Sequence, residues 1–157
     1  MAHVVEVKQV PPQPLAVVRR RARPDELSTV VPQACGEVWT FLKSAGISGA
    51  GRHVAVYLDG AINLEVGAEV SQPIQGDGQV VGSATPAGTV ATTVHMGPYH
   101  RLSEAHAAIH DWCAANQREM AGPSWEVYGH WENDWNEDPS QIRTDVYYLL
   151  KEEESAG

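Results

Sequence analysis

The order of predicted secondary structure is the feature of this sequence that most constrains its fold. Segments with strand and helix patterns follow one another as strand–helix–strand–strand in each half of the 157-residue chain. A strand is predicted where apolar and polar side chains alternate, and a helix where apolar side chains recur every three or four residues. Two such units can join their strands and carry both helices on one face. We therefore expect an α+β fold with an antiparallel sheet, whose other face is partly open and offers a ligand cleft.

In the first half, one further predicted strand precedes the strand–helix–strand–strand order. The strands are Val4–Val10, Leu15–Ala22, His53–Asp59 and Ile62–Val70. The helix begins near Pro24, which suits a first helical turn, and ends at Gly46. Pro32 should kink this helix or begin its second segment, because proline lacks the N–H group that a helix interior needs. Asp59-Gly60 is typical of a hairpin turn between the last two strands.

The second half repeats this order with different letters. Strands are predicted at Gly78–Ala84, Gly88–Met96, Ser124–Trp131 and Thr144–Lys151, and a helix at Gly97–Met120 that Gly122-Pro123 ends. The chain length fits a single domain over residues 1–157. We expect half-units of about 1–74 and 75–151 and a flexible tail at 152–157.

Composition narrows the classes of partner. A net charge of −9 argues against a direct nucleic-acid interface, which requires clustered Lys and Arg. The short basic run Arg19–Arg23 is expected to be a solvated strand end. The acidic total favours cationic ligands, although solubility alone also explains it. No apolar stretch approaches the roughly 20 residues of a membrane span, and the first residues do not resemble a signal peptide. We expect a cytoplasmic protein.

The segment Pro123–Trp135, "PSWEVYGHWENDW", places acids among aromatic residues. On an extended strand Glu126 and Tyr128 point to one side, and Trp125 and Val127 to the other. We expect Trp125 and Val127 to face the helices, which directs Glu126 and Tyr128 to the open face. A buried carboxylate is costly without a partner. Glu126 is therefore either a solvated strand acid or a residue whose partner is not part of the chain.

Four segments carry a resemblance to a known family. They are "ATTVHMGPYHRLSEAHAAIHDWC" (Ala91–Cys113), "VYLDGAINLEVGAEVSQPI" (Val56–Ile74), "SWEVY" and "TDVYYLL", in an order that covers nearly the whole chain. In these segments the sequence resembles the GyrI-like family of small-molecule-binding domains, which are related to the effector domains of multidrug-sensing transcription regulators. The two-unit module accounts for the whole length, so the chain resembles a stand-alone form with no DNA-binding helix-turn-helix.

The resemblance implies a pseudo-two-fold pair of βαββ units, with aromatic rings along a ligand cleft and a buried glutamate at its base. Matched by motif, the glutamate is Glu126, and Tyr57 and Tyr147 are aromatic cleft residues. Tyr128 shares the face of Glu126. We weigh Trp39 as a residue at one end of the cleft and Trp131 as part of a lid, with ordinary packing as the alternative for each. The Trp-rich continuation "GHWENDWNEDP" is longer than in the family and is where ligand specificity is expected to differ.

Three functions are compatible with this resemblance. The first is binding of an amphipathic or planar aromatic, cationic drug or toxin, for sensing, sequestration or resistance, through the charge of Glu126 and the tyrosine rings. The second is a hydrolase that opens the cyclopropane ring of DNA-alkylating natural products, with Glu126 as the catalytic carboxylate that deprotonates a water. The third is a gyrase-binding inhibitor, which requires a protein partner. No cofactor or metal is expected, because His106 and His110 in "HAAIH" lack the glutamate of the HExxH pattern.

Overall fold

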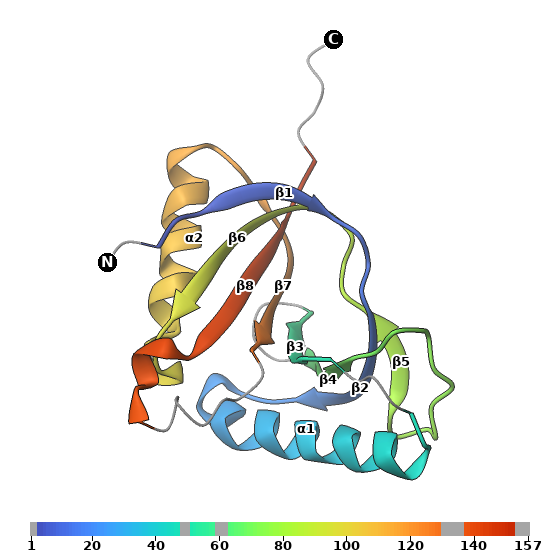
Figure 1. Cartoon of the computed structure of the whole chain (residues 1–157). Coiled ribbons are helices and arrows are strands. Elements are labelled where there is room, and N and C mark those ends of the chain that lie inside the picture. The colour runs from blue at the N-terminus through green and yellow to red at the C-terminus, as the bar shows by residue number, and fades with distance from the viewer. Residues whose placement is uncertain (1–2, 48–50, 59–62, 130–136, 153–157) are drawn as a thin grey trace.

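Eight strands form one antiparallel sheet in the computed structural model, which describes residues 3–47, 51–58, 63–129 and 137–152 (Figure 1). The strands are β1 (Glu6–Val10), β2 (Pro14–Arg21), β3 (His53–Tyr57), β4 (Asn63–Glu69), β5 (Val81–Ala84), β6 (Gly88–Met96), β7 (Met120–Tyr128) and β8 (Arg143–Leu150). The helices are α1 (Leu27–Ser44) and α2 (Ser103–Ala115), and short 3-10 turns form at η1 (Pro24–Glu26), η2 (Tyr99–Arg101) and η3 (Pro139–Gln141). The predicted α+β class is confirmed.

The predicted repeat is visible in the strand order β1-β6-β8-β7-β3-β4-β2-β5. One strand–helix–strand–strand unit consists of β2, α1, β3 and β4, and the other of β6, α2, β7 and β8. The units join where β3 pairs with β7. The two remaining strands are exchanged: β1 precedes the first unit but pairs with β6, and β5 precedes the second unit but pairs with β2. The sheet of each unit therefore gains, at its outer edge, the strand that precedes the other unit in the chain.

Both helices cover the same face of the sheet, which we call the helix face. Helix α1 packs on β2, β3 and β4 in one apolar cluster, and α2 packs on β6 and β8 in another. The register places Ala55 of the first cluster and Val146 of the second on either side of Glu126, so these three side chains share a face. Figure 1 shows α1 and α2 on the outer side of the curved sheet. The predicted placement of both helices on one face is confirmed.

The opposite face, which we call the inner face, was expected to be partly open, but its centre is a core of its own. Fully or almost fully buried side chains from four strands meet there: Leu15, Val17, Val54, Val56, Val90, Trp125 and Val127. The short connection from β1 to β2 links the edge strand β1 to β2, which lies beside the opposite edge strand β5, as Figure 1 shows. Gln13 in this connection donates its backbone N–H to Thr85 Oγ1 at 2.9 Å. The curvature of the sheet therefore buries apolar residues that no helix covers.

The second helix is shorter than predicted. It ends at Ala115 rather than near Met120, and Gln117 has a positive φ of 51°. Strand β7 then begins at Met120, and its pairing with β8 is irregular between Met120 and Ser124. Pro123 in this stretch has no N–H group to donate to a ladder, which accounts for the interruption. A Gly-Pro pair that was predicted to end a helix instead lies within an irregular strand.

The first helix ends as predicted. Gly46 follows it with a φ of 69°, and the N–H of Ile47 donates to the carbonyl of Leu42. This positive φ favours glycine at the end of a helix. The helix continues through Pro32 as one element. Among the described residues, no helix is both long and apolar enough to cross a membrane.

Candidate functional site

Glu126 lies on β7 in the middle of the sheet, where the two units join, and is 6% exposed. Its neighbours across the sheet are Ala55 on β3 and Val146 on β8. The carboxylate points to the helix face, because His106 of α2 contacts it. The structure thus contains the buried acid that the resemblance implied, and places it beneath the helix layer.

The predicted orientation of β7 was wrong. Trp125 and Val127 were expected to face the helices, but both belong to the core of the inner face. The alternation along the strand was predicted correctly, since Glu126 and Tyr128 do share one side. The error came from assigning the apolar side chains to the helix face. An antiparallel sheet with only one covered face would justify that assignment, but here both faces bury apolar residues.

Three donors converge on the carboxylate of Glu126. Tyr128 donates its hydroxyl to Oε1 at 2.5 Å, and Tyr57 donates to the same oxygen at 3.2 Å. His106 Nε2 lies 2.6 Å from Oε2. Two phenols therefore bind one carboxylate oxygen and an imidazole binds the other. Among the described residues, neither Lys nor Arg forms an ion pair with Glu126.

A second row of aromatic groups surrounds these contacts. His106 Nδ1 lies 2.7 Å from the Tyr148 hydroxyl, and the ring of His110 meets Tyr148 edge-on at 5.0 Å between centroids. Tyr99 of η2 meets the ring of Tyr128 in the same geometry, at 5.9 Å. The site is thus a carboxylate bound by two phenols, from β3 and β7, and one imidazole, from α2, and Tyr148 of β8 is hydrogen-bonded to that imidazole.

The phenol groups of this site are held in their protonated form. Burial is the main cause that raises the pKa of Tyr57 and of Tyr128, and the charge of Glu126 raises both further. Burial likewise raises the pKa of Tyr148 to about 12, again with a contribution from Glu126. All three hydroxyls are therefore hydrogen-bond donors at neutral pH.

Sequence reasoning missed His106 and Tyr148 as members of this site. His106 was considered only as a metal ligand and Tyr148 was not considered. Helical spacing could have indicated that His106 faces the sheet. His106 is four residues after Leu102 and three before Ile109, and both of those are buried. A histidine on the covered stripe of a helix requires a polar partner on the sheet beneath it.

The other predicted site residues do not join the cluster around Glu126. Tyr147 points to the inner face, where its ring stacks on Trp125 at 5.2 Å with an interplanar angle of 8°. Trp39 lies on α1 and is 49% exposed. Trp131 lies outside the described residues. Roles for Tyr147, Trp39 and Trp131 in ligand binding stay predictions.

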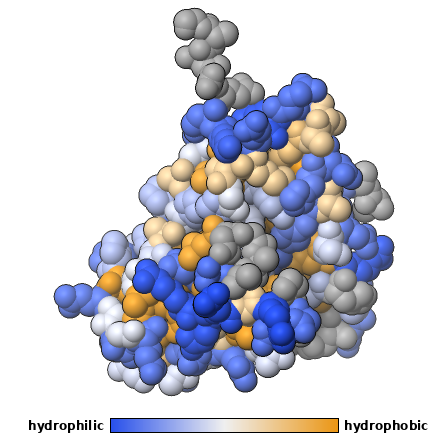
Figure 2. Space-filling model, turned by 180° about the vertical axis from the view of Figure 1, so that it is seen from behind, coloured by the Kyte–Doolittle hydropathy of each residue, from blue (hydrophilic) through white to orange (hydrophobic). Residues whose placement is uncertain are grey.

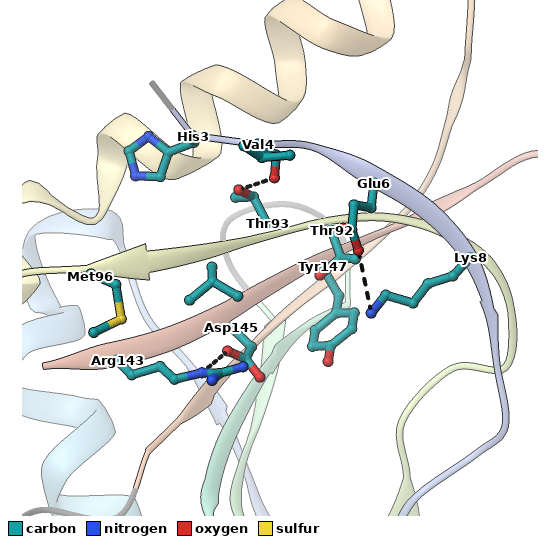
Figure 3. A pocket seen from close by; sticks show the side chains of 11 residues that line it. His3, Val4, Glu6, Lys8, Thr92, Thr93, Met96, Arg143, Asp145 and Tyr147 are labelled. Carbon is teal, nitrogen blue, oxygen red and sulfur yellow. Dashed lines mark hydrogen bonds and ion pairs between the residues drawn. The ribbon is translucent and has the colours of Figure 1, made fainter. Parts of the chain in front are cut away.

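Tyr147 also lines a cavity of about 380 Å³ on the inner face, formed by β1, β6 and β8 (Figure 3). Asp145 lies in its wall, and its side chain is only 9% exposed. Arg143 Nε donates to this carboxylate at 2.9 Å and Arg52 Nη1 donates at 3.2 Å. Asp145 is therefore paired with two guanidinium groups, whereas Glu126 on the helix face has none among the described residues.

Within the described part of the chain, the remaining surface and the other histidines show no second cluster like that around Glu126. Viewed from behind, the molecule is mainly hydrophilic, with apolar residues in smaller areas between (Figure 2). The described part of the chain holds no group of three His, Cys, Asp or Glu side chains placed to bind a metal. Cys35 and Cys113 are both free.

Comparison with known proteins gives one family and several similar structures. The model of the GyrI-like small molecule binding domain matches residues 3–151. The C-terminal domain of EcmrR has a similar structure, with a TM-score of 0.75, 19% identity, and coverage of 98% of this chain and 100% of that domain. A longer EcmrR chain was solved in a complex with DNA, and only 59% of its length is covered. No curated protein has a significantly similar sequence.

Two further structures are more distant. A hydrolase from Listeria innocua has a TM-score of 0.60 at 11% identity, with 96% of this chain and 93% of that chain covered. The protein SAV2435, solved with tetraphenylphosphonium bound, has a TM-score of 0.61 at 10% identity, with coverage of 96% and 94%. At such low identity these structures establish the fold alone.

Proposed function

The chain belongs to the family of GyrI-like small molecule binding domains, and we propose that its ligand is an amphipathic or planar aromatic cation bound at Glu126. One observation carries the proposal. Glu126 is buried, yet its contacts are two neutral phenols and an imidazole, and the described residues offer it no Lys or Arg. A buried carboxylate of this kind lacks a strong counter-ion, and a cationic ligand can supply one.

Magnitudes support a cation rather than a neutral ligand. Removing a carboxylate from water costs several kcal/mol even after the protein relaxes. Hydrogen bonds to a charged group return about 1.5–3 kcal/mol each, so three of them offset most of that cost without cancelling the charge. A cation placed near the tyrosine rings gains a further ~0.5–2 kcal/mol for each good ring contact. The site therefore favours ligands that combine a positive charge with an aromatic or apolar surface.

The contrast between Glu126 and the arginine-paired buried acids Asp145 and Glu65 points to the helix face. Asp145 borders the inner-face cavity, but Arg143 and Arg52 already neutralise it. A cation would gain little from that carboxylate and would meet two positive charges. Glu126 offers the opposite environment, and the net charge of −9 attracts cations from a distance. SAV2435, which has the same fold, was solved with an aromatic cation bound. We propose that the chain senses or sequesters such a drug or toxin in the cytoplasm, and so contributes to resistance.

Binding of two ions of matched shape tests this function. Tetraphenylphosphonium and tetraphenylborate have nearly the same size but opposite charge, so isothermal titration calorimetry with both separates charge from apolar contact. We expect the cation to bind and the anion not to bind. Glu126→Gln should weaken cation binding by about 30-fold or more, as expected for removal of a buried charge partner.

Glu119→Gln is the matched control, because it removes the same charge from an exposed position just before β7 that is paired with Lys151. It should bind tetraphenylphosphonium like the wild type. Cation binding that survives Glu126→Gln unchanged would show that the site lies elsewhere, with the inner-face cavity at Tyr147 as the next candidate.

A hydrolase is the second candidate, favoured by the contact between Glu126 and His106. A carboxylate 2.6 Å from an imidazole can exchange a proton with it, which is what a general base that activates water requires. One similar structure is a hydrolase from Listeria innocua. Incubation with cyclopropane-bearing alkylators, followed by mass spectrometry, distinguishes the two functions. An enzyme yields a product that has gained one water, whereas a binding protein returns the compound unchanged. The gyrase-binding alternative stays a prediction.

A further inference from the structure

His106 is the one side chain with a cationic form that contacts Glu126 among the described residues. Its Nε2 lies 2.6 Å from Oε2, the carboxylate oxygen that neither tyrosine contacts. We propose that His106 is the resident counter-ion of Glu126, and that its proton and a cationic ligand compete for this carboxylate. The inference rests on the proposed binding of a cation at Glu126 and identifies the residue that regulates it.

The hydrogen bonds around His106 suit both of its protonation states. Nε2–H donates to Glu126 in either state. Nδ1 faces the Tyr148 hydroxyl at 2.7 Å. A hydroxyl either donates or accepts after a simple rotation. Tyr148 therefore donates to a neutral Nδ1, or accepts from a protonated Nδ1. No heavy atom needs to move when His106 gains its proton.

Glu126 is the one formal charge among the groups that face His106 within the described residues. From β8 comes the phenol of Tyr148, whose pKa of about 12 keeps it neutral. Tyr57 of β3 and Tyr128 of β7 reach the carboxylate rather than the imidazole. On α2 itself, His110 contacts the far side of the Tyr148 ring, and Cys113 lies near the same hydroxyl.

A second histidine pair lies on the helix face and must be separated from this effect. His3 Nε2 is 3.1 Å from His95 Nδ1, and His95 Nε2 is 3.2 Å from the carbonyl of Pro98. Burial and the neighbouring His95 lower the pKa of His3. Neither ring contacts Glu126, so protonation of this pair does not compete directly for the carboxylate.

The direction of the coupling follows from charge. A cation beside Glu126 lies close to His106 and repels the imidazolium, so ligand binding favours loss of the proton. Coupling between two sites is reciprocal, so the proton weakens cation binding by the same factor. In the pH range where His106 of the ligand-free protein is protonated, the affinity for the cation rises up to about tenfold per pH unit. One proton is then released for each cation that binds. Where His106 is neutral, affinity no longer depends on pH. The site thereby favours ligands that are still positively charged at a pH where the His106 imidazole is neutral.

Tetraphenylphosphonium is a suitable probe because it has no titratable group, so any pH dependence belongs to the protein. Calorimetric titrations of the whole chain between about pH 5.5 and about pH 8 cover the range in which histidine titrates. Two buffers with different heats of ionisation give the number of protons released at each pH. We expect release to approach one proton at the acidic end and to vanish at the alkaline end, with affinity rising in parallel.

His106→Gln is the decisive variant, because its amide can still donate to Oε2 but cannot take up a proton. We expect affinity for tetraphenylphosphonium that is independent of pH over this range and tighter than wild type at the acidic end. His110→Gln is the matched control on the same helix, and His95→Gln disrupts the second pair. Both should keep the wild-type pH dependence.

The outcomes separate this inference from the proposed function. Wild-type protein that binds tetraphenylphosphonium equally at all pH values and releases no proton overturns the competition, while cation binding stands. A pH dependence that persists in His106→Gln also overturns it, because another group then carries the proton. Absence of binding at every pH overturns the proposed function and this inference together. If His106→Gln does not fold, the count of released protons in the wild type still decides.

Discussion

Removal of one hydroxyl at a time from the two tyrosines that bind Glu126 should destabilise the protein unequally. Tyr128 and Tyr57 donate to the same oxygen, at 2.5 and 3.2 Å. A hydrogen bond to a charged group contributes about 1.5–3 kcal/mol, and a neutral or poorly aligned one about 0.5–1.5 kcal/mol. Tyr128→Phe removes the short bond and keeps the ring, so we expect a loss of about 2–3 kcal/mol in the free energy of unfolding. Tyr57→Phe removes the long bond and should cost about 1 kcal/mol.

Urea denaturation followed by tryptophan fluorescence measures both losses, because ΔG falls linearly with denaturant. In thermal unfolding, the Tyr128→Phe loss corresponds to a fall in Tm of roughly 4–12 °C for a domain of this size. Tyr147→Phe is the control, since that hydroxyl lies on the inner face and forms no hydrogen bond with the described residues. It should change stability by less than about 0.5 kcal/mol.

The comparison refutes the reasoning if Tyr57→Phe costs as much as Tyr128→Phe, because distance would then not rank the two bonds. A loss below about 0.5 kcal/mol for Tyr128→Phe would show that Glu126 does not depend on this donor. A double variant Tyr128→Phe/Glu126→Gln completes the cycle, since a real bond makes the two losses non-additive.

Three further perturbations have expected outcomes. Thr144 is fully buried, and its hydroxyl has no partner among the described residues, so Thr144→Val should stabilise the protein by about 1 kcal/mol in urea denaturation. A Cβ at Gly67 would lie 1.7 Å from the carbonyl oxygen of Ala16, so Gly67→Ala should lower unfolding free energy by about 3 kcal/mol. Because the folded-state pKa of Tyr148 is raised to about 12, its contribution is complete below about pH 10 and is lost as pH rises towards 12. Tyr148→Phe should flatten that alkaline decline, as measured by urea titrations at each pH.

The fold could be predicted largely from the sequence because its signals are local. Alternation marks the strands, and helical spacing marks α1 and α2. The ends of α2 and β7 were less predictable, since Gly122-Pro123 suits a helix terminus and an irregular strand equally well. The exchange of β1 and β5 between the units is a long-range pairing, and no local pattern indicates it.

The site was predictable only in part for a related reason. Glu126, Tyr128 and Tyr57 were assigned to one face by their two-residue alternation, and their hydrogen bonds confirm this grouping. Alternation does not say which face that is. The assignment used the rule that apolar residues face helices, and curvature of the sheet gave Trp125 a second apolar environment instead. Tyr147 follows the opposite alternation and lies on the inner face.

The position of Glu126 follows from the way in which two units share one sheet. Each helix covers the strands of its own unit, so α1 and α2 form separate apolar clusters on the helix face. The row where β3 meets β7 lies between them, and Tyr128 is the residue that packs against both clusters. On the helix face this row accepts a carboxylate, which the apolar centre of either cluster would exclude. His106 is the group that α2 extends into the row. A pair of βαββ units therefore creates, at its joint, a buried polar position whose charge a ligand or a histidine proton can balance.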